Sequence, residues 1–118
     1  TRELMIFKHA DDVPSQAVTM EGVEGTEIQW LVTEEDGAPT CALRRFTIRP
    51  GGVIPLHGHE WEHEIYILAG EARAFTGDSS VDVRAGDVLF IPPGELHGYE
   101  STGDGDLSFL CVVPKGAR

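Results

Sequence analysis

The chain has 118 residues, of which 41% are hydrophobic and 25% charged. This length and composition allow one globular domain with its own core and argue against disorder. Nine Lys and Arg against 20 Asp and Glu give a formal net charge of −11, which disfavours nucleic acid and anionic membrane surfaces as partners. The chain shows neither an apolar run of bilayer length nor a signal-peptide pattern, so we expect a cytoplasmic protein.

Fourteen glycines and seven prolines divide the sequence into short β-rich runs. Short strands between turn residues are typical of an all-β sandwich or barrel, and no segment carries a long helical period of apolar residues. For residues 10–19 the pattern is compatible with either a loop or a single helical turn. The predicted strands are Leu4–Lys8, Thr26–Thr33, Thr40–Arg49, His63–Leu68, Glu71–Thr76, Ser80–Arg84, Asp87–Ile91, His97–Glu100 and Leu107–Val113.

The two cysteines, Cys41 and Cys111, lie too far apart for a zinc-ribbon or thioredoxin-like motif. We expect both to be reduced and buried as small hydrophobic side chains.

Alternation along Thr40–Arg49 places Arg44 on the same face as Phe46 and Ile48, so we expect Arg44 to point into the barrel. A buried guanidinium needs an anion, such as a substrate carboxylate, a peroxide or an internal acid. The alternative is a side chain that extends to the barrel mouth. Arg44 is therefore the candidate catalytic residue, in the role of orienting an anionic group.

Four of the five histidines form a pattern. His57, His59 and His63 are spaced by two and four residues, so their rings share one face if the backbone is extended, and His97 follows on a later strand. Convergent neutral imidazoles suit a divalent transition metal. The alternative is a set of hydrogen-bonded core histidines, but unpaired inward rings are costly to bury. We interpret His9 as a surface residue.

Two segments resemble the motifs of the cupin superfamily: residues 51–70, GGVIPLHGHEWEHEIYILAG, and residues 86–97, GDVLFIPPGELH. The resemblance implies a single all-β cupin domain over residues 1–118, folded as a double-stranded β-helix or jelly-roll barrel. His63 stands where the family usually has a glutamate ligand, and Glu64 is a rival for that position. Alternation places Glu64 on the opposite face unless a bulge intervenes, which favours His63.

With four histidines the chain resembles small manganese-binding cupins, some of which cleave carbon–carbon double bonds oxidatively. The resemblance implies one divalent transition metal per chain, manganese or iron first and copper, nickel or zinc as alternatives, with open positions for dioxygen and substrate. We therefore expect a metal-dependent, dioxygenase-like oxidoreductase that cleaves a small unsaturated or aromatic molecule. The alternatives are a metal-assisted isomerase, lyase or decarboxylase, and a cupin that binds a small ligand without turnover.

The substrate pocket is expected to be lined by side chains that share a face with the metal ligands, although each is also open to plain core packing. These are Arg44, Ile54, Trp61, Tyr99, Phe109 and Cys111.

Cupins of this size commonly pair through edge strands. We therefore expect a homodimer in which the N-terminal part of the chain, about residues 1–35, takes part and Leu4–Lys8 is an exchanged strand that blunts an exposed edge.

Overall fold

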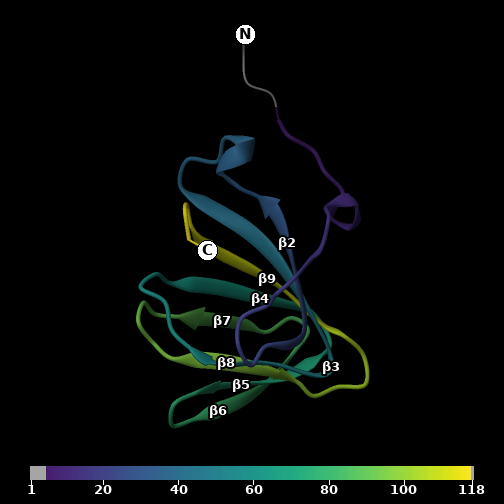
Figure 1. Ribbon diagram of the computed structural model, residues 1–118, viewed down its shortest axis with the longest axis vertical. Coiled ribbons are helices and arrows are strands. Elements are labelled where there is room, and N and C mark those ends of the chain that lie inside the picture. Colours follow the sequence, from purple (N-terminus) through teal and green to yellow (C-terminus); the bar gives the residue numbers. More distant parts are fainter. Residues whose placement is uncertain (1–4, 118) are drawn as a thin grey trace.

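The computed structural model describes residues 5–117, and strands dominate them (Figure 1). The all-β prediction is confirmed, with two one-turn 3-10 helices, η1 (Ala10–Asp12) and η2 (Glu34–Asp36), as the helical elements of this part of the chain. No helix within residues 5–117 is long and apolar enough to cross a membrane. The strands are β1 (Gln16–Ala17), β2 (Glu24–Val32), β3 (Cys41–His57), β4 (His63–Ala69), β5 (Glu71–Thr76), β6 (Ser80–Arg84), β7 (Val88–Ile91), β8 (His97–Ser101) and β9 (Leu107–Pro114).

All the strands pair antiparallel in one curled sheet, in the order β6-β5-β8-β3-β9-β4-β7, with β2 alongside β3 and β1 on β2. Figure 1 shows β9 between β3 and β4, and β5, β6 and β8 gathered at the end opposite the N-terminus. The curl brings the beginnings of β4 and β8 close to the end of β3. The candidate site lies where these three strands meet.

Strand β3 is longer than the predicted Thr40–Arg49, because it passes through Pro50 and changes partners there. Its first part, up to Ile48, pairs with β2 and β9. Its last part, from Val53, pairs with β8, and Val53 also keeps a register partner on β2, Glu24. The bend uses two glycines: Gly51 has a φ of +81°, and a Cβ on Gly52 would lie 2.7 Å from Ile48 Cγ2. Proline ended the predicted strand because it lacks an N–H, but here it lies at the bend where no ladder hydrogen bond is needed.

The core lies inside the curl and is built from alternate residues of the strands. On β9, Leu107, Phe109, Cys111 and Val113 are all buried, while the residues between them are half-buried. Alternation along β9 thus turns one set of its side chains toward the core. Cys41 departs from its prediction: it is exposed, because it is the first residue of β3 at the end of the sheet, and both cysteines are free.

The predicted strand Leu4–Lys8 is not formed over residues 5–8. Leu4 lies outside the residues that the structure describes. Within residues 5–117 no strand pairs with residues 5–8, and Met5 and Phe7 are 93% and 88% exposed. Lys8 anchors the segment, since its Nζ donates to Leu31 O and to Asp36 Oδ2 at 2.8 and 2.9 Å. Residues 10–19 contain both the turn η1 and the short strand β1.

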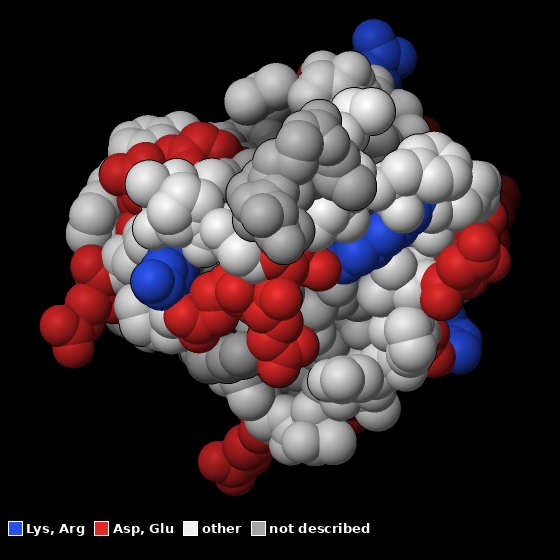
Figure 2. All heavy atoms as spheres, turned by 90° about the horizontal axis from the view of Figure 1, so that it is seen from above, with Lys and Arg blue, Asp and Glu red and all other residues white. Residues whose placement is uncertain are grey.

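The surface is strongly acidic. Figure 2, which looks down the long axis from the N-terminal side, shows Asp and Glu side chains in several clusters and Lys and Arg side chains at separate points. Several of the basic side chains are already paired, as in Arg45–Asp11 at 2.9 Å and Arg49–Glu27 at 3.1 Å. Negative charge therefore dominates outside the barrel.

Candidate metal centre and cavity

Four imidazoles gather at one end of the barrel. His57 ends β3 and is the register partner of His97, the first residue of β8, and their ring centroids are 4.3 Å apart. The His59 ring lies 4.8 Å from His57, and His63, the first residue of β4, lies 5.1 Å from His59. Each ring is thus held beside at least one other.

The route by which the rings meet differs from the expected one. Residues 58–62 form a bent loop between β3 and β4, so even spacing along one extended strand is not what aligns His57, His59 and His63. The loop is held to the β7–β8 turn by a hydrogen bond from the Gly94 N–H to His59 O at 2.7 Å. The loop and the turn together fold the imidazoles toward one another.

Hydrogen bonds leave a free ring nitrogen on two of these histidines. Nδ1 of His57 donates to Pro55 O and Nδ1 of His97 donates to Glu95 O, both at 2.8 Å, so Nε2 of each keeps its lone pair. One ring nitrogen from each of His57, His59 and His97 lies within 4.8 Å of the others. His63 is outside this close trio, and its Nε2 is buried without a hydrogen-bond partner.

Burial lowers the pKa of three of these imidazoles and so favours their neutral form. Desolvation, followed by the neighbouring positive groups, lowers the pKa of His59 to about 4 and that of His63 to about 3, with Arg44 the largest charge acting on His63. Desolvation also lowers the pKa of His97, against a raising contribution from its backbone hydrogen bond. Neutral imidazole is the form that binds metal ions.

The donor set fits a transition metal. Two nitrogens bound to one ion at about 2.1 Å can be at most about 4.2 Å apart, so the trio within 4.8 Å needs only small side-chain movements to close on an ion. His63, whose ring lies 5.1 Å from that of His59 and 5.2 Å from that of His97, is the candidate for a fourth donor through its unpartnered Nε2. The rival Glu64 is exposed on the other face of β4, where a hydrogen bond with Glu62 raises its pKa.

A cavity of about 240 Å³ opens beside the imidazoles, smaller than the sites that hold drug-sized ligands. Five of the six expected pocket residues line this cavity. The sixth, Trp61, lies outside the lining and stacks on His59, with the ring centroids 4.8 Å apart and the ring planes at 10° to each other. Its indole Nε1 is buried without a partner. The lining consists of Gln16, Val18, Met20, Val23, Ile28, Trp30, Arg44, Phe46, Ile54, His57, His59, His63, His97, Tyr99, Phe109 and Cys111.

The sequence interpretation missed one wall of this cavity. Ile28 and Trp30 alternate on β2 and both line the cavity, so their period of two was a usable signal. Residues 16–23 also contribute, through a short strand and a loop without any regular apolar pattern. That part of the wall depends on how the N-terminal segment crosses the sheet.

Arg44 lies against this cavity and does not reach solvent, since it is only 6% exposed. Its Nη2 donates to Cys111 Sγ at 3.1 Å, and its guanidinium lies 5.3 and 5.1 Å from the ring centroids of Trp30 and Phe46. No carboxylate within residues 5–117 forms an ion pair with it, and its Nε has no hydrogen-bond partner. The cavity therefore carries an uncompensated positive charge, which is costly to bury without an anion.

The thiol of Cys111 and the phenol of Tyr99, which also line the cavity, are uncharged. Burial raises the pKa of Cys111, and burial also raises that of Tyr99 well above its usual range. The remaining walls are mostly apolar. The cavity thus combines a set of imidazole nitrogens and one guanidinium with a hydrophobic interior.

Comparison with known proteins agrees with this architecture. Residues 44–113 match the family model described as Cupin domain. The chain is 37% identical over 112 residues to an oxalate-binding protein of Thermotoga maritima, covering 92% of this chain and 93% of that protein. Among solved structures it is similar to the polyketide cyclase RemF of Streptomyces resistomycificus, with a TM-score of 0.88, 36% identity and coverage of 94% of this chain and 80% of that one.

A second solved structure, described as a predicted oxalate decarboxylase from Thermotoga maritima, has a TM-score of 0.82 and 33% identity, covering 93% of this chain and 99% of that one. These relatives share the fold but carry different described activities, so the fold alone does not determine the reaction. The family match covers more than half of the chain, including all of β4 and β8 and most of β3 and β9. The chain belongs to the cupin family.

Proposed function

We propose that this cupin binds one divalent transition metal ion through His57, His59, His63 and His97. The observation that carries the proposal is the convergence of four imidazoles, three of which offer ring nitrogens within 4.8 Å of one another while the fourth has a buried, unpartnered Nε2. Manganese and iron are the first candidates, with copper, nickel and zinc as alternatives. Four neutral ligands leave the ion its full charge.

We further propose that the ligand is a small organic acid with an apolar body. Arg44 supplies the charge that a carboxylate would neutralise, and the walls around it are apolar and enclose about 240 Å³. The likeness to an oxalate-binding protein supports a small carboxylate at this place. In this arrangement Arg44 orients the acid group and the apolar walls hold the rest of the molecule and exclude water.

The proposed reaction is an oxygenase reaction on an unsaturated or aromatic acid. A bound ion would supply Lewis acidity and bring dioxygen to the substrate. An oxygen-independent reaction at the same centre, such as an isomerisation, lyase step or decarboxylation, is the second candidate. The 36% identity to a polyketide cyclase favours this second candidate.

The test begins with the metal content of untagged protein purified without chelators or nickel resin. The protein loaded with each candidate ion is then incubated with oxalate and with unsaturated and aromatic acids, with and without dioxygen. Oxygen uptake coupled to product formation supports the oxygenase. Equal turnover without dioxygen supports the second candidate, and ligand recovered unchanged from a stable complex supports a binding protein. A protein that takes up none of the ions contradicts the metal site.

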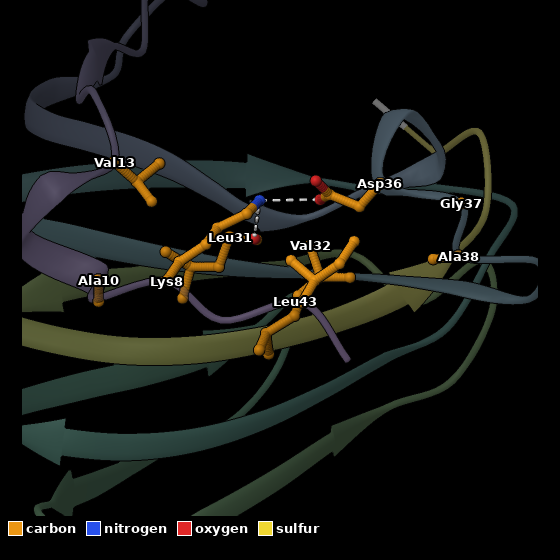
Figure 3. Close-up of a pocket in the computed structure, with 10 residues that line it drawn as sticks. Lys8, Ala10, Val13, Leu31, Val32, Asp36, Gly37, Ala38 and Leu43 are labelled. Carbon is orange, nitrogen blue, oxygen red and sulfur yellow. Dashed lines mark hydrogen bonds and ion pairs between the residues drawn. The ribbon is translucent and has the colours of Figure 1, made fainter. Parts of the chain in front are cut away.

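We also propose that the chain forms a homodimer. The segment around Met5 and Phe7 exposes apolar side chains, and at its base lies an apolar groove of about 430 Å³ beside Leu31 and Leu43 (Figure 3). Figure 3 shows Lys8 linked to Asp36 and Leu31 across this groove. In a two-fold dimer the exposed segment of each copy would cover the groove of the other, so one contact would bury both apolar surfaces.

Light scattering tests this assembly. The expected mass is twice the 12.8 kDa of one chain, and Phe7→Asp is expected to shift the protein toward the monomer by placing a charge in the interface. A wild-type protein with the mass of one chain contradicts the proposal. A dimer whose stability is unchanged in the variant excludes this segment as the contact.

A further inference from the structure

His63 differs from His57 and His97 in the groups that its Nδ1 contacts. Nδ1 of His57 and of His97 each faces a backbone carbonyl, which can only accept a hydrogen bond and so fixes the proton on Nδ1. Nδ1 of His63 faces the Cys111 sulfur at 3.2 Å and Nη2 of Arg44 at 3.4 Å. A thiol can donate or accept and a guanidinium only donates, so the tautomer of His63 depends on how these two groups are arranged.

The two possible tautomers leave His63 in different states. If Nδ1 carries the proton, it donates to the Cys111 sulfur and Nε2 keeps a lone pair. If Nε2 carries the proton, Nδ1 accepts from the thiol or from Arg44, and the Nε2–H becomes a buried donor with no acceptor. Only the first tautomer lets His63 bind a metal ion through Nε2.

The contacts of Arg44 favour the first tautomer. Its Nη2 lies closer to the Cys111 sulfur, at 3.1 Å, than to Nδ1 of His63, at 3.4 Å, so the sulfur is the better placed acceptor for its N–H. A sulfur that accepts from Arg44 can accept from His63 as well. The guanidinium cannot swing freely toward the imidazole, because it also contacts the rings of Trp30 and Phe46.

The sheet places Cys111 between these partners. Strand β9 lies between β3 and β4, and Cys111 is opposite Arg44 on one side and opposite Ile65 on the other. His63 is two residues from Ile65 on the same face of β4, so its ring lies next to the sulfur. The arrangement is thus set by strand register in the middle of the sheet and not by a mobile loop.

We propose that Cys111 is a positioning residue for the metal site: its sulfur, anchored by Arg44, accepts the Nδ1–H of His63 and keeps Nε2 of His63 open toward the ion. The inference deepens the proposed function and rests on the four-histidine metal site. It gives the cysteine a role that its burial as a small hydrophobic residue does not require. Cys111 acts here through His63.

The test compares Cys111→Val, which removes the acceptor at similar size, with Cys111→Ser, which keeps one. Val113→Ala is the matched control, because Val113 is buried on the same face of β9 and does not contact His63 through a hydrogen bond. Two quantities are measured on the full chain: the imidazole tautomer of His63, from ¹⁵N NMR of the metal-free protein, and the affinity for Zn²⁺ used as a probe.

Wild type, Cys111→Ser and Val113→Ala are expected to show His63 protonated at Nδ1, whereas Cys111→Val is expected to shift toward the Nε2–H form. The Zn²⁺ affinity of Cys111→Val should fall about 10–100-fold, with that of the other two variants close to wild type. An unchanged tautomer in Cys111→Val overturns the inference, and so does an equal loss of affinity in all three variants. If neither wild type nor any variant binds Zn²⁺ but the tautomer shifts as expected, the proposed metal site is contradicted. The role of Cys111 in fixing the tautomer of His63 is then still supported.

Discussion

Replacing Arg44 by methionine should make the metal-free, ligand-free protein more stable. Desolvation of a buried ion costs several kcal/mol, even after relaxation. Against this, Arg44 gains two cation–π contacts, about 0.5–2 kcal/mol each, and one hydrogen bond to sulfur, about 0.5–1.5 kcal/mol. With no carboxylate partner among the described residues, the balance favours Arg44→Met by about 1–2 kcal/mol, or about 3–8 °C in Tm for a chain of this size.

The same change should weaken binding of an anionic ligand. Loss of a charged hydrogen bond of about 1.5–3 kcal/mol corresponds to a roughly 10–100-fold weaker affinity for oxalate in the metal-loaded protein. Denaturant unfolding and calorimetric titration measure the two effects. Arg45→Met is the control: Arg45 is the next residue, faces outward and pairs with Asp11 and Gln29, so its loss should be neutral or slightly destabilising.

Two results would refute this reasoning. If Arg44→Met is destabilised by more than about 1 kcal/mol, the guanidinium is a structural part of the core and its contacts outweigh its desolvation. If the variant is more stable but binds oxalate as wild type does, the buried charge is real but does not recognise the anion. A gain in stability together with a loss of affinity is the pattern of a residue kept for function at a cost to the fold.

Three further outcomes are expected. Imidazoles of the unfolded chain titrate near 6.5, whereas burial lowers the pKa of His59 to about 4 and that of His63 to about 3. Because the unfolded state binds more protons between these values, the metal-free protein should lose stability as the pH falls from about 7 to about 4. A free energy of unfolding that does not change with pH in denaturant titrations would contradict this. The Gly98→Ala variant should have a free energy of unfolding about 1–3 kcal/mol lower than wild type, because the added Cβ would lie 2.5 Å from a carbonyl oxygen of β3 and 2.6 Å from an aromatic ring of β5. Gly77→Ala is the control in the same unfolding assay and should be nearly neutral, because its Cβ would have no atom within 4 Å. A bound divalent ion at a hundred times its Kd should raise the unfolding free energy by about 2.7 kcal/mol, and an unchanged Tm on metal addition would count against the site.

Most strands could be predicted because their alternation and turn residues are local features. The runs that became β4 to β9 were found within one or two residues at each end, and Arg44 and Cys111 were placed on the inner face by alternation alone. Strand β3 was underestimated, because its extension past Pro50 depends on a new partner, β8, that is far away in the sequence. Pairing of distant segments is invisible to a local pattern.

The site shows the same division between local and non-local information. The four histidines were recognisable from spacing and from the cupin motifs, yet the loop that turns His59 toward His97 was not, since it depends on a hydrogen bond to the β7–β8 turn. Trp61 was expected in the pocket because it shares parity with the histidines, but parity does not apply within a bent loop. The contacts of His63 with Cys111 and Arg44 needed the order of β3, β9 and β4 in the sheet.

The charges on the surface and the charge inside the barrel have opposite effects on an acidic ligand. The formal net charge of −11 and the acidic clusters in Figure 2 repel anions at long range, while Arg44 attracts them within the cavity. At physiological ionic strength the repulsion is screened over about 8 Å, so a small ligand with one acid group loses little on approach, whereas a polyanion meets many surface charges at once. The buried guanidinium is screened far less, because the cavity walls around it are apolar. If the cavity takes an acid as proposed, this combination favours a small acid over a large polyanion, for reasons that are independent of which metal the histidines hold.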